Sequence, residues 1–152
     1  MKKQELADGI RFAGQRVVTM AQNTKDWDHQ LGHQWTSRDA FAHVASTAPG
    51  AANLAPMLDG PMLSGLGVNQ IAAMNASNIS QMAGKSNEEI TQAILDGMNT
   101  SASFVETMAE DDLDKLVNLG GYSWPKSEII AQIWIHHQMA HAYEASARWP
   151  LL

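Results

Sequence analysis

Three histidines in the sequence have the spacing of metal ligands. His137 and His141 stand four residues apart in the segment IHHQMAH. On a helix, side chains four residues apart lie on one face, so these two imidazoles can converge on one ion. A third ligand must come from another element, and His43 in RDAFAHVAS is the candidate. Three imidazoles on one side of a divalent ion would leave a position open to water and substrate, as in catalytic zinc sites.

Both groups of histidines are expected on helices, with their side chains toward an interior. On the last predicted helix the inward stripe follows the i, i+3, i+4, i+7 rule and comprises Ile130, Ile133, Trp134, His137, Ala140, His141 and Glu144. His136 is rotated by about 100° from this stripe, so we expect it at the side of the helix or in solvent. His43 shares its helix face with Ala40, Val44 and Thr47. The small residues Ala40, Thr47 and Ala140 would leave room for a cavity.

Other interpretations of these residues stay open. With six histidines in the chain, a pair four residues apart also arises by chance, and a core imidazole can be satisfied by hydrogen bonds alone. A second pair, His29 and His33, contains Gly32 and is expected in a connection, in solvent or in a local hydrogen bond. Glu144 is the candidate catalytic residue. It would orient the imidazole of His141, act as a general base, or remain a solvated charge.

The elements that must position these residues are predicted to be helices. The expected helices cover roughly 2–24, 37–58 with a bend or interruption at Pro49, 68–82, 86–109 and 125–148. Capping boxes at Thr36 and Ser86 mark two of the starts, and Pro125 is expected at the first position of the last helix. Residues 110–124 are expected to be a turn-rich connection, and no alternation typical of strands stands out. The prediction is an all-α fold, a four-helix bundle with a short extra helix in the middle crossover, in a single domain over residues 1–152.

Composition narrows the function classes. The net charge of −6 without a Lys/Arg cluster argues against nucleic acid or an anionic membrane as partner. The chain has no cysteine, which excludes disulfides, thiolate ligands and a cysteine nucleophile and fits a cytoplasmic location. No apolar run has the length of a signal peptide or a membrane span. A small-molecule substrate is the partner that the proposed metal site predicts.

Two segments resemble a known family. QWTSRDAFAHVAS, residues 34–46, resembles the pattern W-[ST]-x-[RK]-[DE]-hydrophobic-x-x-H that opens the second helix in the DinB-like superfamily. That superfamily includes the N-terminal domain of mycothiol-dependent maleylpyruvate isomerase and the bacillithiol transferases. IHHQMAH resembles its last-helix metal motif, a ligand followed by three residues and a histidine. Weaker similarities in NQIAAMNASN, SNEEI and YSWPKSEII extend the resemblance over most of the chain.

The resemblance implies a four-helix bundle, often a homodimer, that holds one divalent ion through His43, His137 and His141. The isomerase branch usually has Glu where this chain has His137, so the chain is more similar to the all-histidine branch. With Zn²⁺ or Ni²⁺ as the expected ion, a low-molecular-weight thiol or water would be activated to attack a small electrophile. The outcomes would be S-transfer, thiol-assisted isomerisation or hydrolysis. The alternative is a non-catalytic helical bundle that binds a metal or an apolar ligand.

Overall fold

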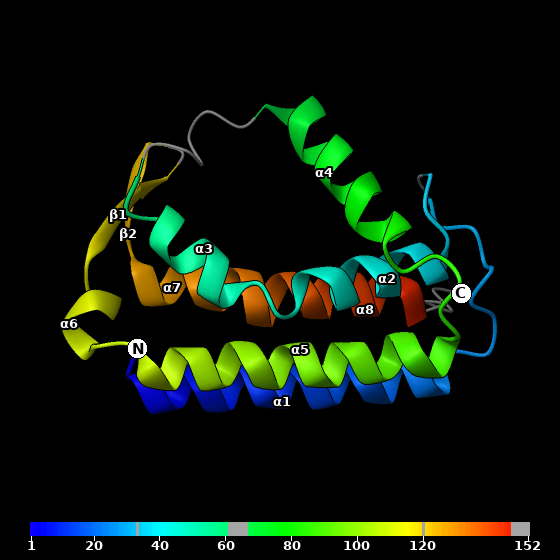
Figure 1. The fold of residues 1–152 in the computed structure, drawn as a ribbon, viewed down its shortest axis with the longest axis horizontal. Helices are drawn as coiled ribbons and strands as arrows, with labels where there is room; N and C mark the ends of the chain where they lie inside the picture. The colour runs from blue at the N-terminus through cyan, green and yellow to red at the C-terminus, as the bar shows by residue number, and fades with distance from the viewer. Residues whose placement is uncertain (33, 61–66, 120, 147–152) are drawn as a thin grey trace, which may run out of the picture.

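The structure is a computed structural model, and it describes residues 1–32, 34–60, 67–119 and 121–146. These residues are mostly helical, as the sequence predicts, with one small two-stranded sheet (Figure 1). The elements in chain order are α1 (Lys3–Asn23), α2 (Ser37–Thr47), α3 (Ala51–Met57), α4 (Val68–Ser80), α5 (Asn87–Thr107), α6 (Glu110–Leu113), β1 (Leu116–Leu119), β2 (Tyr122–Pro125), α7 (Lys126–Ala131), the π-helix η2 (Gln132–His137) and α8 (Gln138–Ser146).

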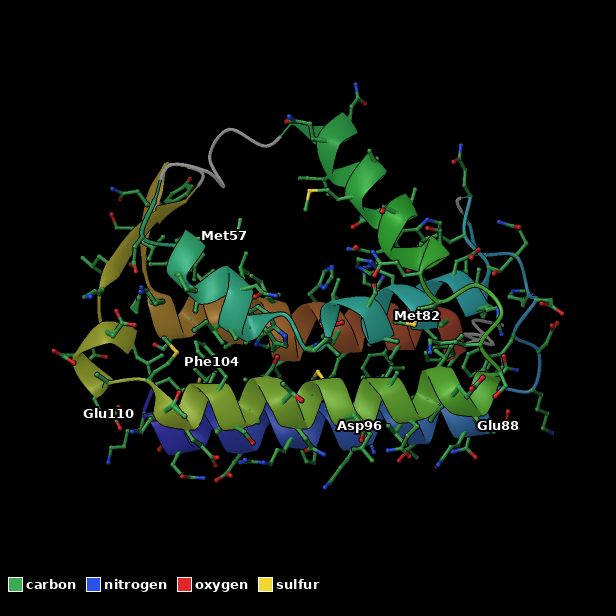
Figure 2. All side chains as sticks on the ribbon, viewed as in Figure 1. Met57, Met82, Glu88, Asp96, Phe104 and Glu110 are labelled. Carbon is green, nitrogen blue, oxygen red and sulfur yellow. The ribbon has the colours of Figure 1, made fainter. Side chains whose placement is uncertain are left out.

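The long helices pack around a shared apolar core. In Figure 1 α1 and α5 lie side by side, and α2 and α8 lie along them. The largest apolar side chains that are fully buried come from α1, α2, α5, α6 and the last helical stretch: Leu6, Ile10, Val17, Phe41, Ile90, Ile94, Met98, Leu113, Ile130 and Trp134. Figure 2 shows the opposite face of α5, where Glu88 and Asp96 are exposed to solvent. Burial of one apolar stripe per helix therefore fixes how α2 and α8 face each other.

Two capping boxes start their helices where the sequence predicts. The Thr36 side chain accepts from the N–H of Asp39 at 3.2 Å, and the Asp39 carboxylate accepts from the N–H of Thr36 at 2.8 Å. Ser86 and Glu89 repeat the arrangement at the start of α5, with distances of 3.1 and 2.7 Å. These boxes satisfy amide groups that a helix start leaves without partners. The helix that carries His43 is thus fixed at its first residue.

The predicted interruption at Pro49 is confirmed. Helix α2 ends at Thr47, and the chain resumes as α3 at Ala51. This junction lies directly on α5, because a Cβ atom at Gly97 would lie 2.7 Å from Cβ of Ala48 and 2.8 Å from Cδ of Pro49. Only a glycine allows this close approach of the two backbones.

The stretch before the last helix differs from the prediction. Residues expected to form a turn-rich connection contain the short helix α6 and an antiparallel hairpin, in which Leu116 pairs with Pro125 and Leu119 with Tyr122. The sequence carries the signal, two glycines between two runs of strand-forming residues, and Gly121 has a φ of +83°. Pro125 is accordingly the last strand residue and the N-cap of α7, not the first helical residue.

The last helical stretch also departs from a simple α-helix. Between α7 and α8 the backbone widens into η2, a π-helix that ends at His137. Trp134 is buried within η2, and the buried positions after it are Gln138, Ala142 and Ala145. These three lie one residue later than the predicted inward positions His137, His141 and Glu144. Ala140, expected inside, is exposed. The predicted end of this helix at Arg148 lies outside the described residues.

Helix α4 forms within the predicted range and has no buried residue. It contacts α2 and otherwise rises away from the long helices (Figure 1). The loop predicted over residues 60–67 lies mostly outside the described residues. Among the helices that the structure describes, none combines the length and the apolar character that crossing a membrane requires.

Candidate metal centre

The structure brings the three predicted histidines together. His43 comes from α2, His137 from the last turn of η2 and His141 from α8. One ring nitrogen of each can be chosen so that all three lie within 4.8 Å of one another. The rings meet edge to face, with centroids 5.4 Å apart for His43 and His137, 4.8 Å for His43 and His141, and 4.6 Å for His137 and His141. Residues nearly one hundred positions apart in the chain therefore form one cluster.

The spacing inside the last helix suits a metal ion. The Nε2 atoms of His137 and His141 are 3.2 Å apart. Two nitrogens bound at about 2.0–2.1 Å to a tetrahedral Zn²⁺ ion lie roughly 3.3 Å from each other. A nitrogen of His43 lies within 4.8 Å of a nitrogen of each of the other two rings. The two residues of the helix pair thus already have the separation of two zinc ligands.

His43 is the buried member of the cluster. Its exposed fraction is 2 %, and within the described residues neither of its ring nitrogens has a hydrogen-bond partner. A buried polar group without a partner is costly and requires an explanation, such as an ion. Burial, with smaller contributions from His141 and His137, lowers the pKa of His43 to about 4. The imidazole is therefore neutral at pH 7, which is the form that binds metals.

The other two rings are partly open to solvent. Burial first, and the neighbouring His141 second, lower the pKa of His137. His136 is exposed, as predicted, and does not join the cluster. His43 is therefore the buried side of the cluster, and the two histidines of the last helical stretch form its partly exposed side.

Glu144 lies against His141. Its Oε2 atom is 3.3 Å from Nδ1 of His141, while Nε2 of the same ring faces His137. A carboxylate on the far nitrogen keeps the proton on Nδ1 and leaves Nε2 free to bind a metal, as is usual for metal-binding histidines. Among the roles considered for Glu144, this contact favours orientation of the imidazole. A catalytic role for Glu144 stays a prediction.

Trp35 is a neighbour of the cluster that the sequence analysis did not single out. Its ring centroid lies 5.1 Å from that of His43 and 5.5 Å from that of His141. The indole therefore forms an aromatic wall beside two of the three imidazoles. Its position directly before the Thr36 cap, at the head of the quoted QWTS motif, is the sequence signal that could have identified it.

Of the second histidine pair, His29 is not part of the described cluster. His29 is exposed in the connection between α1 and α2. His33 lies outside the described residues. The prediction that this pair faces solvent therefore holds for His29.

Comparison with known proteins gives no further identification. No protein-family model, no curated protein and no solved structure matches this chain. The features that indicate a function are therefore the histidine cluster and the two sequence motifs that contribute to it.

Proposed function

We propose that this chain is a divalent-metal-dependent enzyme of DinB-like type, which activates a low-molecular-weight thiol, or water, to attack a small electrophile. The observation that carries the proposal is the convergence of His43, His137 and His141, with ring nitrogens within 4.8 Å and those of His43 without hydrogen-bond partners among the described residues. The expected reactions are S-transfer and thiol-assisted isomerisation, and metal-dependent hydrolysis is the third.

The family assignment is part of the proposal. We propose that α1, α2, α5 and the stretch α7–η2–α8 form a four-helix bundle of DinB-like type, and that α4 is the extra helix in the crossover. The contacts of α1 with α5, and of α2 with α5 and α8, support this arrangement. Both quoted motifs contribute to one site, since the first supplies Trp35 and His43 and the second supplies His137 and His141.

The donor set supports Zn²⁺ or Ni²⁺ as the ion. Imidazole nitrogens bind both ions well, and three protein ligands with an open position are typical of catalytic zinc sites. When bound, such an ion would lower the pKa of a thiol or water at its open position and so supply a nucleophile at neutral pH. Because the chain has no cysteine, the thiol would come from a separate small molecule.

The protein's own residues would hold and shape the site. His43 anchors the cluster from the buried side, and His137 and His141 complete it from the open side. Glu144 keeps His141 in the tautomer that presents Nε2. The Trp35 indole gives the site one aromatic wall, which suits the carbon skeleton of a small organic electrophile.

A metal-dependent conjugation assay tests the proposal. The chain, first freed of metal with a chelator, is mixed with L-cysteine or glutathione and a chromogenic haloarene, with and without added Zn²⁺ or Ni²⁺. We expect a rate above the uncatalysed reaction that needs the ion and is lost when His43, His137 and His141 are all changed to Ala. His136→Ala is the matched control and should keep the rate. A chain that binds the ion but gives no rate with thiols, and no hydrolysis, would favour the non-catalytic alternative.

A further inference from the structure

Side-chain hydrogen bonds at three levels join helix α2 and its C-cap Ala48 to the last helical stretch. Ser37 Oγ donates to the carbonyl oxygen of Ala145 at 2.8 Å, and Gln138 Nε2 donates to Thr47 Oγ1 at 3.0 Å. Trp134 Nε1 donates to the carbonyl oxygen of Ala48 at 2.9 Å. All three donor residues are buried. We call these contacts the polar ladder.

The polar ladder sets the position of the two helices along each other. Residue 37 pairs with residue 145, residue 47 with 138 and residue 48 with 134, which is the order expected for two antiparallel helices. The contact of His43 with His141 lies inside this antiparallel sequence of contacts. A shift of one helix along the other would therefore separate the imidazoles.

Gln138 is the central contact of the polar ladder. Its exposed fraction is 0 %, and its Nε2 donates to Oγ1 of Thr47 at 3.0 Å, while its Oε1 lies 3.3 Å from the same hydroxyl oxygen. The Thr47 hydroxyl in turn donates to the carbonyl oxygen of His43 at 2.9 Å. A continuous path of hydrogen bonds thus runs from the residue next to His137 to the backbone of His43.

Filling this buried position does not require an amide. A leucine at this position would fill a similar volume without the cost of burying a polar group. The neighbouring backbone does need a constraint, because η2 ends at His137 and Gln138 is the first residue of α8. π-helical turns are rare in proteins, and those that occur are often found at functional sites. The hydrogen bond from the Gln138 amide to Thr47 connects this junction to α2.

We infer that Gln138 is a positioning residue of the metal centre, which acts through Thr47 to hold His137 and His141 opposite His43. This inference rests on the proposed function, since it assumes that the three histidines bind an ion. Gln138 touches no ring nitrogen of the cluster in any described hydrogen bond, so its effect would be indirect.

Titration with Co²⁺ alone tests the inference, because its visible absorption reports the geometry around the ion. Gln138→Leu and Thr47→Val remove the contact from either side, and Thr47→Ser retains the hydroxyl. Gln132→Leu makes the matched change at an exposed glutamine of η2. We expect Gln138→Leu and Thr47→Val to bind Co²⁺ about 10- to 100-fold more weakly, with a changed spectrum and unchanged far-ultraviolet circular dichroism. Thr47→Ser and Gln132→Leu should match the wild type.

Three outcomes would overturn the inference. Wild-type affinity and spectrum in both Gln138→Leu and Thr47→Val would reject the positioning role and leave the proposed function intact. Loss of cooperative unfolding in both variants would show that the contact serves the fold as a whole. A wild-type chain that binds neither Co²⁺ nor Zn²⁺ would reject the proposed metal function, and the inference with it.

Discussion

The Nε2 atoms of His137 and His141 lie 3.2 Å apart across one turn of the last helical stretch. Without metal, two neutral rings at this distance share a single hydrogen bond, in which one nitrogen donates and the other accepts. A divalent ion would replace the shared proton and bind both nitrogens. The buried His43 ring would then supply the third ligand, and its uncharged state means that no proton would have to leave it at pH 7.

Glu144 is expected to strengthen metal binding without touching the ion. Changing Glu144 to Ala removes the acceptor 3.3 Å from Nδ1 of His141, so the ring loses its fixed tautomer and orientation. We expect the affinity for Zn²⁺ to fall about 10-fold or more. Competition with a chromogenic chelator measures this affinity, with Glu128→Ala as a control at an exposed carboxylate of α7. Equal affinities in the two variants would remove Glu144 from the site.

Trp35 should report the arrival of an ion. A paramagnetic ion such as Cu²⁺ or Ni²⁺ held by the histidines would lie beside the indole, whose centroid is 5.1 Å from that of His43, and would quench its fluorescence. We expect saturable quenching that is mostly absent from Trp35→Phe and unchanged in Trp124→Phe, which alters an exposed ring of the hairpin. Quenching that persists in full in Trp35→Phe would place the ion elsewhere.

The stability of the metal-free protein should depend on pH through His43. Its pKa is about 4 in the folded protein, against 6.5 for the unperturbed side chain. As the pH falls below about 6.5 the unfolded chain takes up a proton that the folded chain does not bind, so the free energy of unfolding decreases until about pH 4 and then stops responding to this group. Urea unfolding of wild type and His43→Leu across this interval measures the difference in slope. Identical slopes would contradict the assigned burial of a neutral His43.

Lys126 makes a separate prediction about stability. Its side chain is 1 % exposed, and its Nζ lies 2.7 Å from Asp59 and 3.0 Å from Asp112. These two ion pairs connect the segment after α3 with α6 and α7. Hydrogen bonds from Lys115 and Lys126 lower the pKa of Asp112, so the carboxylate is charged at neutral pH.

The double change Asp59→Asn with Asp112→Asn leaves a buried ammonium group without a carboxylate. We expect it to lower the free energy of unfolding by about 3 kcal/mol, whereas Lys126→Met, which removes the buried charge itself, should stay within about 1 kcal/mol of wild type. Chemical denaturation of the three proteins gives the comparison. The reverse order would show that Lys126 contributes through its charge interactions more than its burial costs.

Much of the helical framework could be predicted because its signals are local. The capping boxes at Thr36 and Ser86 place the starts of α2 and α5 to the residue, and Pro49 marks the break after α2. The pair His137 and His141 followed from helical spacing along the last helical stretch, and His43 followed from its place on the interior face of the second predicted helix. Local periodicity and caps are sufficient for features of this kind.

The remaining features depend on contacts between distant residues. A π turn in η2 shifts the buried stripe so that Gln138 and not Ala140 faces α2, and only packing against that helix reveals the shift. The contact of Trp35 with His141 joins segments far apart in the chain. The hairpin is a different case, since its glycine pair was present in the sequence but the segment was interpreted as a turn-rich connection without strands.

Metal stoichiometry tests the central claim most directly. Equilibrium dialysis against Zn²⁺, followed by elemental analysis, is to be carried out on the wild type, His137→Ala, His136→Ala and the triple change of His43, His137 and His141 to Ala. The account predicts about one ion per chain in the wild type and in His136→Ala, a strong loss in His137→Ala and none in the triple variant, which should still be helical. A wild type without metal, or a triple variant that retains a full equivalent, would contradict it.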